Sequence, residues 1–138
     1  MELADTTVWS KRRLLPPDGH GAFEVQLQRG DVATCDPVKA ELLYTARNVD
    51  ELRAMRADLQ SLPFCPIGSE GWARAFDVYE LLAARGGAHH REVPFNDLLI
   101  AAAAEAAGMP VLHYDRHFER IAEVTGQPVR AIAPLGSL

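Results

Sequence analysis

The chain has 138 residues, a formal net charge of −5, and ordinary globular shares of hydrophobic (48%) and charged (24%) residues. This length predicts one domain, residues 1–138, with a hydrophobic core of its own. No apolar run reaches the roughly 20 residues that a membrane span requires. The acidic charge argues against a protein that holds nucleic acid by bulk electrostatics alone, so a bound phosphate would need a metal ion or local arginines.

The first residues and the cysteines indicate where the protein works. Glu2 and Asp5 stand where a signal peptide would carry positive charge, so we expect a cytoplasmic protein. Cys35 and Cys65 form no CxxC pair and are expected to be buried free thiols.

The first third of the chain alternates predicted strands and helices. Leu3 and Ala4 lead into Asp5, which ends a first strand, and Thr6 or Thr7 can cap the following helix or support a metal site. Prolines and glycines predict a loop over residues 16–21. The next predicted elements are a helix over Ala22–Gln28, a strand over Val32–Cys35, a helix that Asp36 caps and Pro37 begins, and a helix from Asn48 or Asp50 to Leu59.

Glu41 conflicts with the apolar pattern of its helix. Val38 and Leu42 define the apolar face, and Glu41 lies within about 60° of Val38 at 100° per residue. Its carboxylate therefore points inward. Either its stem packs at the rim while its head reaches water, or the group is held toward a shared site.

The rest of the chain continues the alternation. Adjacent His89 and His90 make a poor chelating pair and are expected in a solvated loop. The aromatic stripe from Trp72 to Leu82 is expected to be core. The remaining predicted elements are a short strand around Cys65 and Ile67, a helix that carries Asp97 at its start and ends at Gly108, a strand over Val111–Tyr114, a helix over Phe118–Val124 and a strand over Val129–Ile132.

This order is typical of an α/β protein in which helices cover both faces of a parallel sheet. Asp115 directly follows a buried strand, at the edge where open α/β sheets bind ligands. The same crevice can receive Asp5, Asp97 and Glu41. Four close carboxylates repel one another unless a cation neutralises them, and hard oxygen ligands favour Mg²⁺ or Mn²⁺.

Four stretches carry a family resemblance that covers essentially the whole chain. LADTTVW, VKAELLYTAR, VPFNDLLIAAAAEAAG and VLHYDRHFERIA resemble, in order and spacing, the acidic motifs of PIN-domain ribonucleases, specifically the VapC toxins of bacterial toxin–antitoxin pairs. The resemblance implies a PIN-like three-layer α/β/α fold with a mainly parallel sheet. It also implies Mg²⁺- or Mn²⁺-dependent endonucleolytic cleavage of structured RNA such as tRNA or rRNA, a VapB-type antitoxin and a homodimer.

Carried over by position, the family's catalytic and metal-binding acids fall on Asp5, Glu41, Asp97 and Asp115, with Thr6 or Thr7 as the neighbouring hydroxyl. Many relatives place an acidic or amide residue two positions after the fourth acid, where this chain has His117. That departure puts a second metal site in doubt, although His117 could orient a water or a phosphate. The candidates for RNA phosphate contacts are Lys11, Arg12, Arg13, Arg116 and Arg120.

Two alternatives stay open from the sequence. A PIN-like scaffold could bind RNA or an antitoxin with negligible turnover. A phospho-acceptor receiver domain also clusters aspartates at strand ends around magnesium, but Glu41 has no role there and a convincing lysine after the late strand is lacking.

Overall fold

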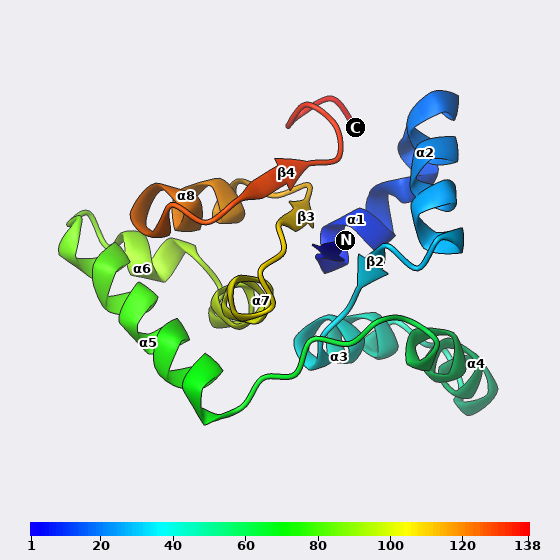
Figure 1. The fold of residues 1–138 in the computed structure, drawn as a ribbon, viewed down its shortest axis with the longest axis horizontal. Helices are drawn as coiled ribbons and strands as arrows, with labels where there is room; N and C mark the ends of the chain where they lie inside the picture. The colour runs from blue at the N-terminus through cyan, green and yellow to red at the C-terminus, as the bar shows by residue number, and fades with distance from the viewer.

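The structure, a computed structural model, describes residues 1–138 and is built on a four-stranded parallel sheet (Figure 1). The strand order is β2-β1-β3-β4, and the strands are β1 (Glu2–Ala4), β2 (Val32–Ala33), β3 (Val111–His113) and β4 (Val129–Ala131). In β1, Leu3 pairs with Ala33 on one side and with Val111 on the other. The first strand is therefore central, and its carboxyl end lies beside that of β3.

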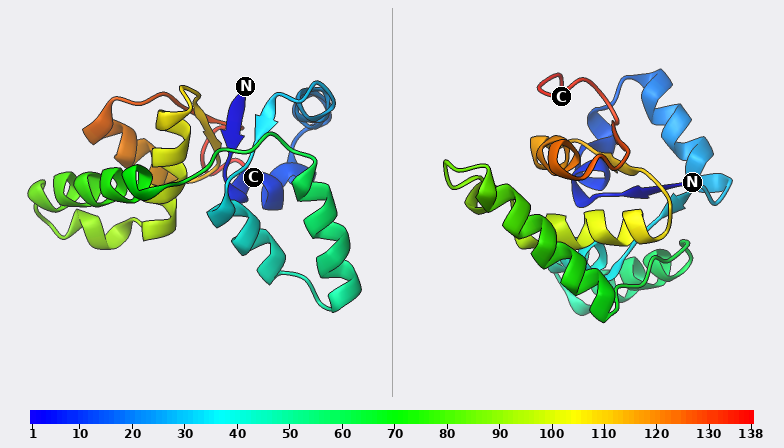
Figure 2. Two further views of the ribbon diagram at one scale, coloured as in Figure 1. Left: turned by 60° about the horizontal axis from the view of Figure 1, so that its bottom comes forward. Right: turned by 60° about the vertical axis from the view of Figure 1, so that its left-hand side comes forward.

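Helices make up most of the chain, and Figure 2 shows them from two further sides. They are α1 (Thr6–Lys11), the 3₁₀ helix η1 (Arg12–Leu14), α2 (Pro17–Gln28), α3 (Asp36–Tyr44), α4 (Val49–Gln60), α5 (Ser69–Ala84), α6 (His89–Glu92), α7 (Phe95–Ala106) and α8 (Arg116–Thr125). No helix is long and apolar enough to cross a membrane.

Alternating strand residues divide the core between the two faces of the sheet, as the pleat requires. Ala4 and Leu112 pack with Val8 of α1 and Phe23 of α2. On the other face, Leu3 and neighbouring strand residues pack with side chains of α3, α5, α7 and α8. This arrangement confirms the predicted three-layer α/β/α fold with a parallel sheet.

Helix α7 is the most deeply buried element and is seen end-on near the centre of Figure 1. Every residue from Asp97 to Ala104 is buried. Its run of alanines lets it approach the strands closely, which larger side chains would prevent. On its outer side, Glu105 accepts a 2.7 Å hydrogen bond from Arg74 of α5. The packing of α7 thus fixes the position of Asp97 in its first turn.

The predicted loop over residues 16–21 was wrong, because α2 begins at Pro17. Proline suits the first turn of a helix, whose N–H groups lack partners in any case, and Asp18 complements the positive end of the helix dipole. Asp36 is the first residue of α3 rather than its cap, since Cys35 occupies the cap position.

The predicted strand around Cys65 was also wrong. The structure has only an isolated parallel bridge between Thr34 and Phe64, because Pro63 and Pro66 offer no N–H to extend the ladder. Cys35 and Cys65 are buried and free, as predicted.

The α5–α6 region differs from the prediction in two ways. Trp72 and Phe76 were expected in the core but are 47% and 57% exposed, stacked or tilted against Phe95. His89 and His90 begin the short helix α6 and are half-buried rather than solvated, with His90 edge-on to Tyr79. This side of the molecule therefore carries aromatic surface that the helical periodicity assigned to the interior.

Candidate active site

Asp5 is fixed by its own helix start. The residue lies between β1 and α1, and its Oδ2 accepts hydrogen bonds from the backbone N–H of Thr7 (3.1 Å) and from the Thr7 hydroxyl (2.6 Å). Asp5, rather than Thr6 or Thr7, is therefore the helix cap. The Thr7 hydroxyl also accepts from the Tyr114 backbone N–H (2.9 Å), which ties the ends of β1 and β3 together. Asp5 is 2% exposed, and burial raises its pKa.

Asp97 is the most perturbed acid of the protein. It lies in the first turn of α7 and is 8% exposed. Burial, followed by the negative charges of Asp5, Asp115 and Glu41, raises its pKa from 3.8 to about 8. Asp5, Asp115 and Glu41 therefore lie close enough to Asp97 for their charges to act on it.

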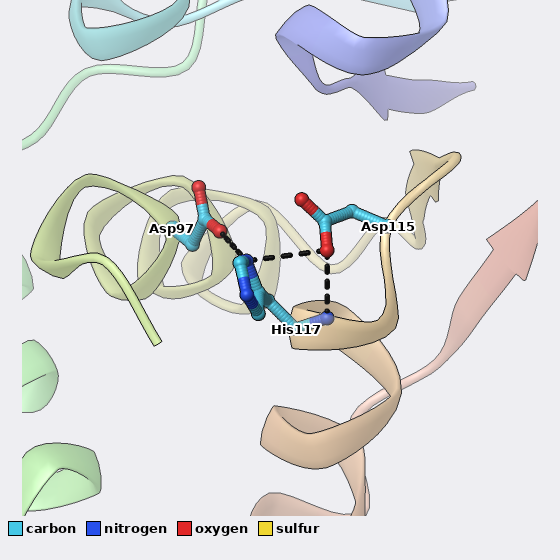
Figure 3. A group of neighbouring side chains, drawn as sticks. All are labelled: Asp97, Asp115 and His117. Carbon is cyan, nitrogen blue, oxygen red and sulfur yellow. Dashed lines mark hydrogen bonds and ion pairs between the residues drawn. The ribbon is translucent and has the colours of Figure 1, made fainter. Parts of the chain in front are cut away.

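Asp115 and His117, at the start of α8, lie against Asp97 in the first turn of α7. Asp115 caps α8, and its Oδ1 accepts a hydrogen bond from the His117 backbone N–H (3.0 Å). Figure 3 shows the imidazole of His117 between the two carboxylates. Its Nδ1 lies 3.0 Å from Oδ2 of Asp97 and 3.2 Å from Oδ1 of Asp115. His117 therefore contacts two of the four acids directly.

Glu41 reaches the same place from α3. Its side chain is half-buried, and its Oε1 accepts a hydrogen bond from Nδ2 of Asn96 (3.2 Å). The Glu41 charge contributes to the raised pKa of both Asp5 and Asp97. Both predicted roles of Glu41 agree with a half-buried side chain that is hydrogen-bonded next to Asp97.

The predictions from the sequence missed three residues around these acids: Asn96, His113 and Glu119. Asn96 directly precedes Asp97 in the sequence, and its side chain orients Glu41. The Asp115 backbone N–H donates to Nδ1 of His113 (3.1 Å). Because Nδ1 accepts, the ring proton lies on Nε2. That Nε2 lies 3.0 Å from Oε1 of Glu119. His113 is fully buried, and burial lowers its pKa, so the ring is neutral. Its position, a polar residue inside an apolar strand two residues before Asp115, was the available signal.

Comparisons with known proteins identify the family of the chain. The PIN domain profile matches residues 3–124. The chain is 38% identical over 134 residues to ribonuclease VapC18 of Mycobacterium tuberculosis, covering 97% of this chain and 96% of that protein. It is 39% identical over 136 residues to ribonuclease VapC51 of the same organism, covering 99% and 96%. The chain belongs to the VapC branch of the PIN-domain family.

Solved structures of VapC-containing complexes share the fold. The DNA-bound VapBC of Salmonella typhimurium superposes with a TM-score of 0.72 at 18% identity, covering 96% of this chain and 100% of that chain. A member of the VapBC toxin–antitoxin family from M. tuberculosis, VapBC-5, is 26% identical with a TM-score of 0.57, covering 94% and 95%. The PIN-domain assignment leaves no place for the receiver-domain alternative.

The donor set of this VapC-family site suits a divalent cation. None of its four carboxylates forms an ion pair with a lysine or an arginine, and only His117 lies within salt-bridge distance of any of them. Two of them, Asp5 and Asp97, are only 2% and 8% exposed, and buried carboxylates without a fixed cation are costly in the ionised state. Oxygen ligands of this kind are those that Mg²⁺ and Mn²⁺ take.

The predicted RNA-contacting side chains have different surroundings. Arg120 forms an ion pair with Glu92, and the Arg12 guanidinium lies 5.4 Å from the centre of the Trp9 ring. Lys11, Arg13 and Arg116 form no ion pair. Arg116 is exposed and directly follows Asp115, which places it at the rim of the acidic crevice.

Proposed function

We propose that this chain is a metal-dependent endoribonuclease that acts as the toxin of a toxin–antitoxin pair and cleaves structured RNA such as tRNA or rRNA. One observation carries the proposal. Asp97, buried at the start of α7, has its pKa raised to about 8 by burial and by three other carboxylates, with no lysine or arginine paired to them. The identity to VapC ribonucleases over nearly the whole chain supports the same activity.

In this proposal, Asp5, Glu41, Asp97 and Asp115 hold Mg²⁺ or Mn²⁺. When bound, the divalent ion supplies Lewis acidity that activates water and offsets charge on the phosphodiester. Asp97 would have to be deprotonated to help hold the ion.

The residues around the acids have defined tasks. Thr7 holds Oδ2 of Asp5 with two hydrogen bonds, so this carboxylate is oriented before any ligand arrives. Asn96 does the same for Oε1 of Glu41. Fixed carboxylates need little rearrangement during the reaction, which is the main advantage of a prearranged site.

RNA phosphates need cationic partners outside the acid cluster. Lys11, Arg13 and Arg116 are the proposed contacts, because none of them is committed to an ion pair. Arg12 and Arg120 remain candidates that would first have to leave Trp9 and Glu92, respectively. Because only a few cations are free to contact phosphates, the loss of RNA affinity with rising salt should be shallow.

A VapB-type antitoxin is the proposed protein partner. A groove of about 450 Å³ runs beside the site between α1 and the α3–α4 pair, and its lining mixes apolar and charged side chains. Trp9, Leu42 and Met55 offer apolar contacts there, and Thr6 joins the groove to the acid cluster. A second copy of the chain is proposed to pack on the exposed aromatics Trp72 and Phe76.

The test is cleavage of a total tRNA and rRNA pool by antitoxin-free protein, with Mn²⁺, with Mg²⁺ and with chelator. Discrete metal-dependent fragments that disappear with Asp97→Asn support the proposal. Asp77→Asn is the matched control, because Asp77 is an exposed acid on α5 outside the site. Folded protein that binds metal and RNA without cleaving any of the pool would favour the scaffold alternative.

A further inference from the structure

His117 brings a nitrogen atom into an otherwise acidic site. His117, Asp97 and Asp115 each offer one possible ligand atom, and these three atoms lie within 4.8 Å of one another. The three atoms come from the first turn of α7 and from the start of α8 (Figure 3). The side chain of His117 is 30% exposed, so a small ion can reach it from solvent.

The two distances from Nδ1 fit ligands on one ion, although the shorter one also fits the hydrogen bond to Asp97. Two neighbouring ligands with bonds of about 2.1 Å to an octahedral ion lie about 3.0 Å apart. Nδ1 of His117 lies 3.0 Å and 3.2 Å from its two carboxylate neighbours. An imidazole nitrogen carries one hydrogen or one lone pair, so it cannot make a good hydrogen bond to both oxygens at once. A shared cation would satisfy all three atoms.

The backbone already positions the histidine for this task. The His117 N–H donates to Oδ1 of Asp115, so the cap that starts α8 fixes the residue beside the carboxylate. The Asp115 N–H is in turn held by the buried ring of His113. Hydrogen bonds of this kind set the orientation of metal ligands in many proteins.

We propose that Nδ1 of His117 is a ligand of the divalent ion and that it makes the site prefer Mn²⁺ over Mg²⁺. Imidazole nitrogen suits first-row transition ions, whereas Mg²⁺ takes oxygen ligands and keeps its water. This inference rests on the proposed function for the presence of an ion and adds the identity of the ion and of one ligand.

Direct binding measurements test the preference without reference to cleavage. The dissociation constants of Mn²⁺ and Mg²⁺ are measured by titration calorimetry at pH 7.5 for metal-stripped native chain, His117→Asp and His117→Ala. His117→Asp supplies an all-oxygen set, so the ratio of the Mg²⁺ to the Mn²⁺ constant should fall about tenfold or more. His117→Ala should weaken Mn²⁺ binding by about 10- to 100-fold. His20→Ala, on α2, is the matched control and should change neither constant.

Spectroscopy of the native chain gives an answer that needs no variant. Bound Mn²⁺ should show a nitrogen coupling in electron spin echo experiments, and ¹⁵N-histidine labelling should change its frequency. Tight Mn²⁺ binding without nitrogen coupling, or an unchanged ion preference in His117→Asp, overturns this inference and leaves the metal-dependent nuclease intact. Failure to bind either ion overturns both this inference and the proposed function.

Discussion

Asp97→Asn should inactivate the protein while making its metal-free form more stable. Burial and three neighbouring acids raise the Asp97 pKa from 3.8 to about 8. The unfolded chain ionises this group freely at pH 7.5, whereas the folded chain keeps it largely protonated. By linkage, relative to a neutral side chain, the carboxyl group therefore lowers the free energy of unfolding by at most about 5 kcal/mol.

Asparagine has nearly the same shape and removes this linkage. Its amide still has to be buried in an acidic environment, and that desolvation lowers the free energy of unfolding by about 1 to 3 kcal/mol. The expected net gain is about 2 kcal/mol in the free energy of unfolding, or roughly 6 °C in Tm for a chain of this size.

The assay is urea unfolding followed by circular dichroism at pH 7.5 in chelator, for the native chain, Asp97→Asn and Asp77→Asn. Saturating Mn²⁺, at about 100 times its dissociation constant, should raise the free energy of unfolding of the native chain by about 2.7 kcal/mol. It should raise that of Asp97→Asn only slightly. Cleavage by Asp97→Asn should fall at least about 100-fold. If Asp97→Asn is clearly less stable than the native chain in chelator while Asp77→Asn is unchanged, the repulsion described for the acid cluster is wrong.

Three further predictions follow from the same contacts. Without metal, the stabilisation from protonated Asp97 is complete below about pH 4 and is lost as the pH rises to about 8, so urea unfolding should show a less stable protein at pH 8 than at pH 5.5. Thr7→Val removes the hydroxyl that donates to Asp5 and should lower the free energy of unfolding, measured in the same assay, by about 1 to 3 kcal/mol. His113→Phe leaves the Asp115 N–H without its acceptor and should weaken Mn²⁺ binding about tenfold by calorimetry, whereas unchanged binding would show that this hydrogen bond does not position the ligand.

The sequence predicts the framework of the site because its signals are local. Leu3 and Ala4 before Asp5, and the apolar run before Asp115, mark strand ends, and parallel strands bring such ends to one edge. Glu41 was found from helical periodicity alone. The family resemblance then gave these acids a common role.

The features that were missed depend on partners far away in the sequence. Asn96 donates a hydrogen bond to Glu41, which is 55 positions away in the sequence, and no local pattern around either residue predicts this contact. The segment around Cys65 is different, because the limit was local: Pro63 and Pro66 lack the N–H groups that would extend the bridge into a ladder. Exposure of Trp72 and Phe76 follows from where α5 crosses α7, which periodicity within one helix cannot reveal.

The strand order also sets when, during synthesis, the site can exist. The central strand β1 is made first, but its neighbour β3 follows more than 100 positions later, and His117 comes later still. Asp5 is therefore made more than 100 positions before Asp115 can join it, and contacts at this sequence separation form late in folding. An emerging chain lacks the complete acid cluster until α8 has been made. Any activity that needs all four acids therefore cannot begin while only the first two strands have emerged from the ribosome.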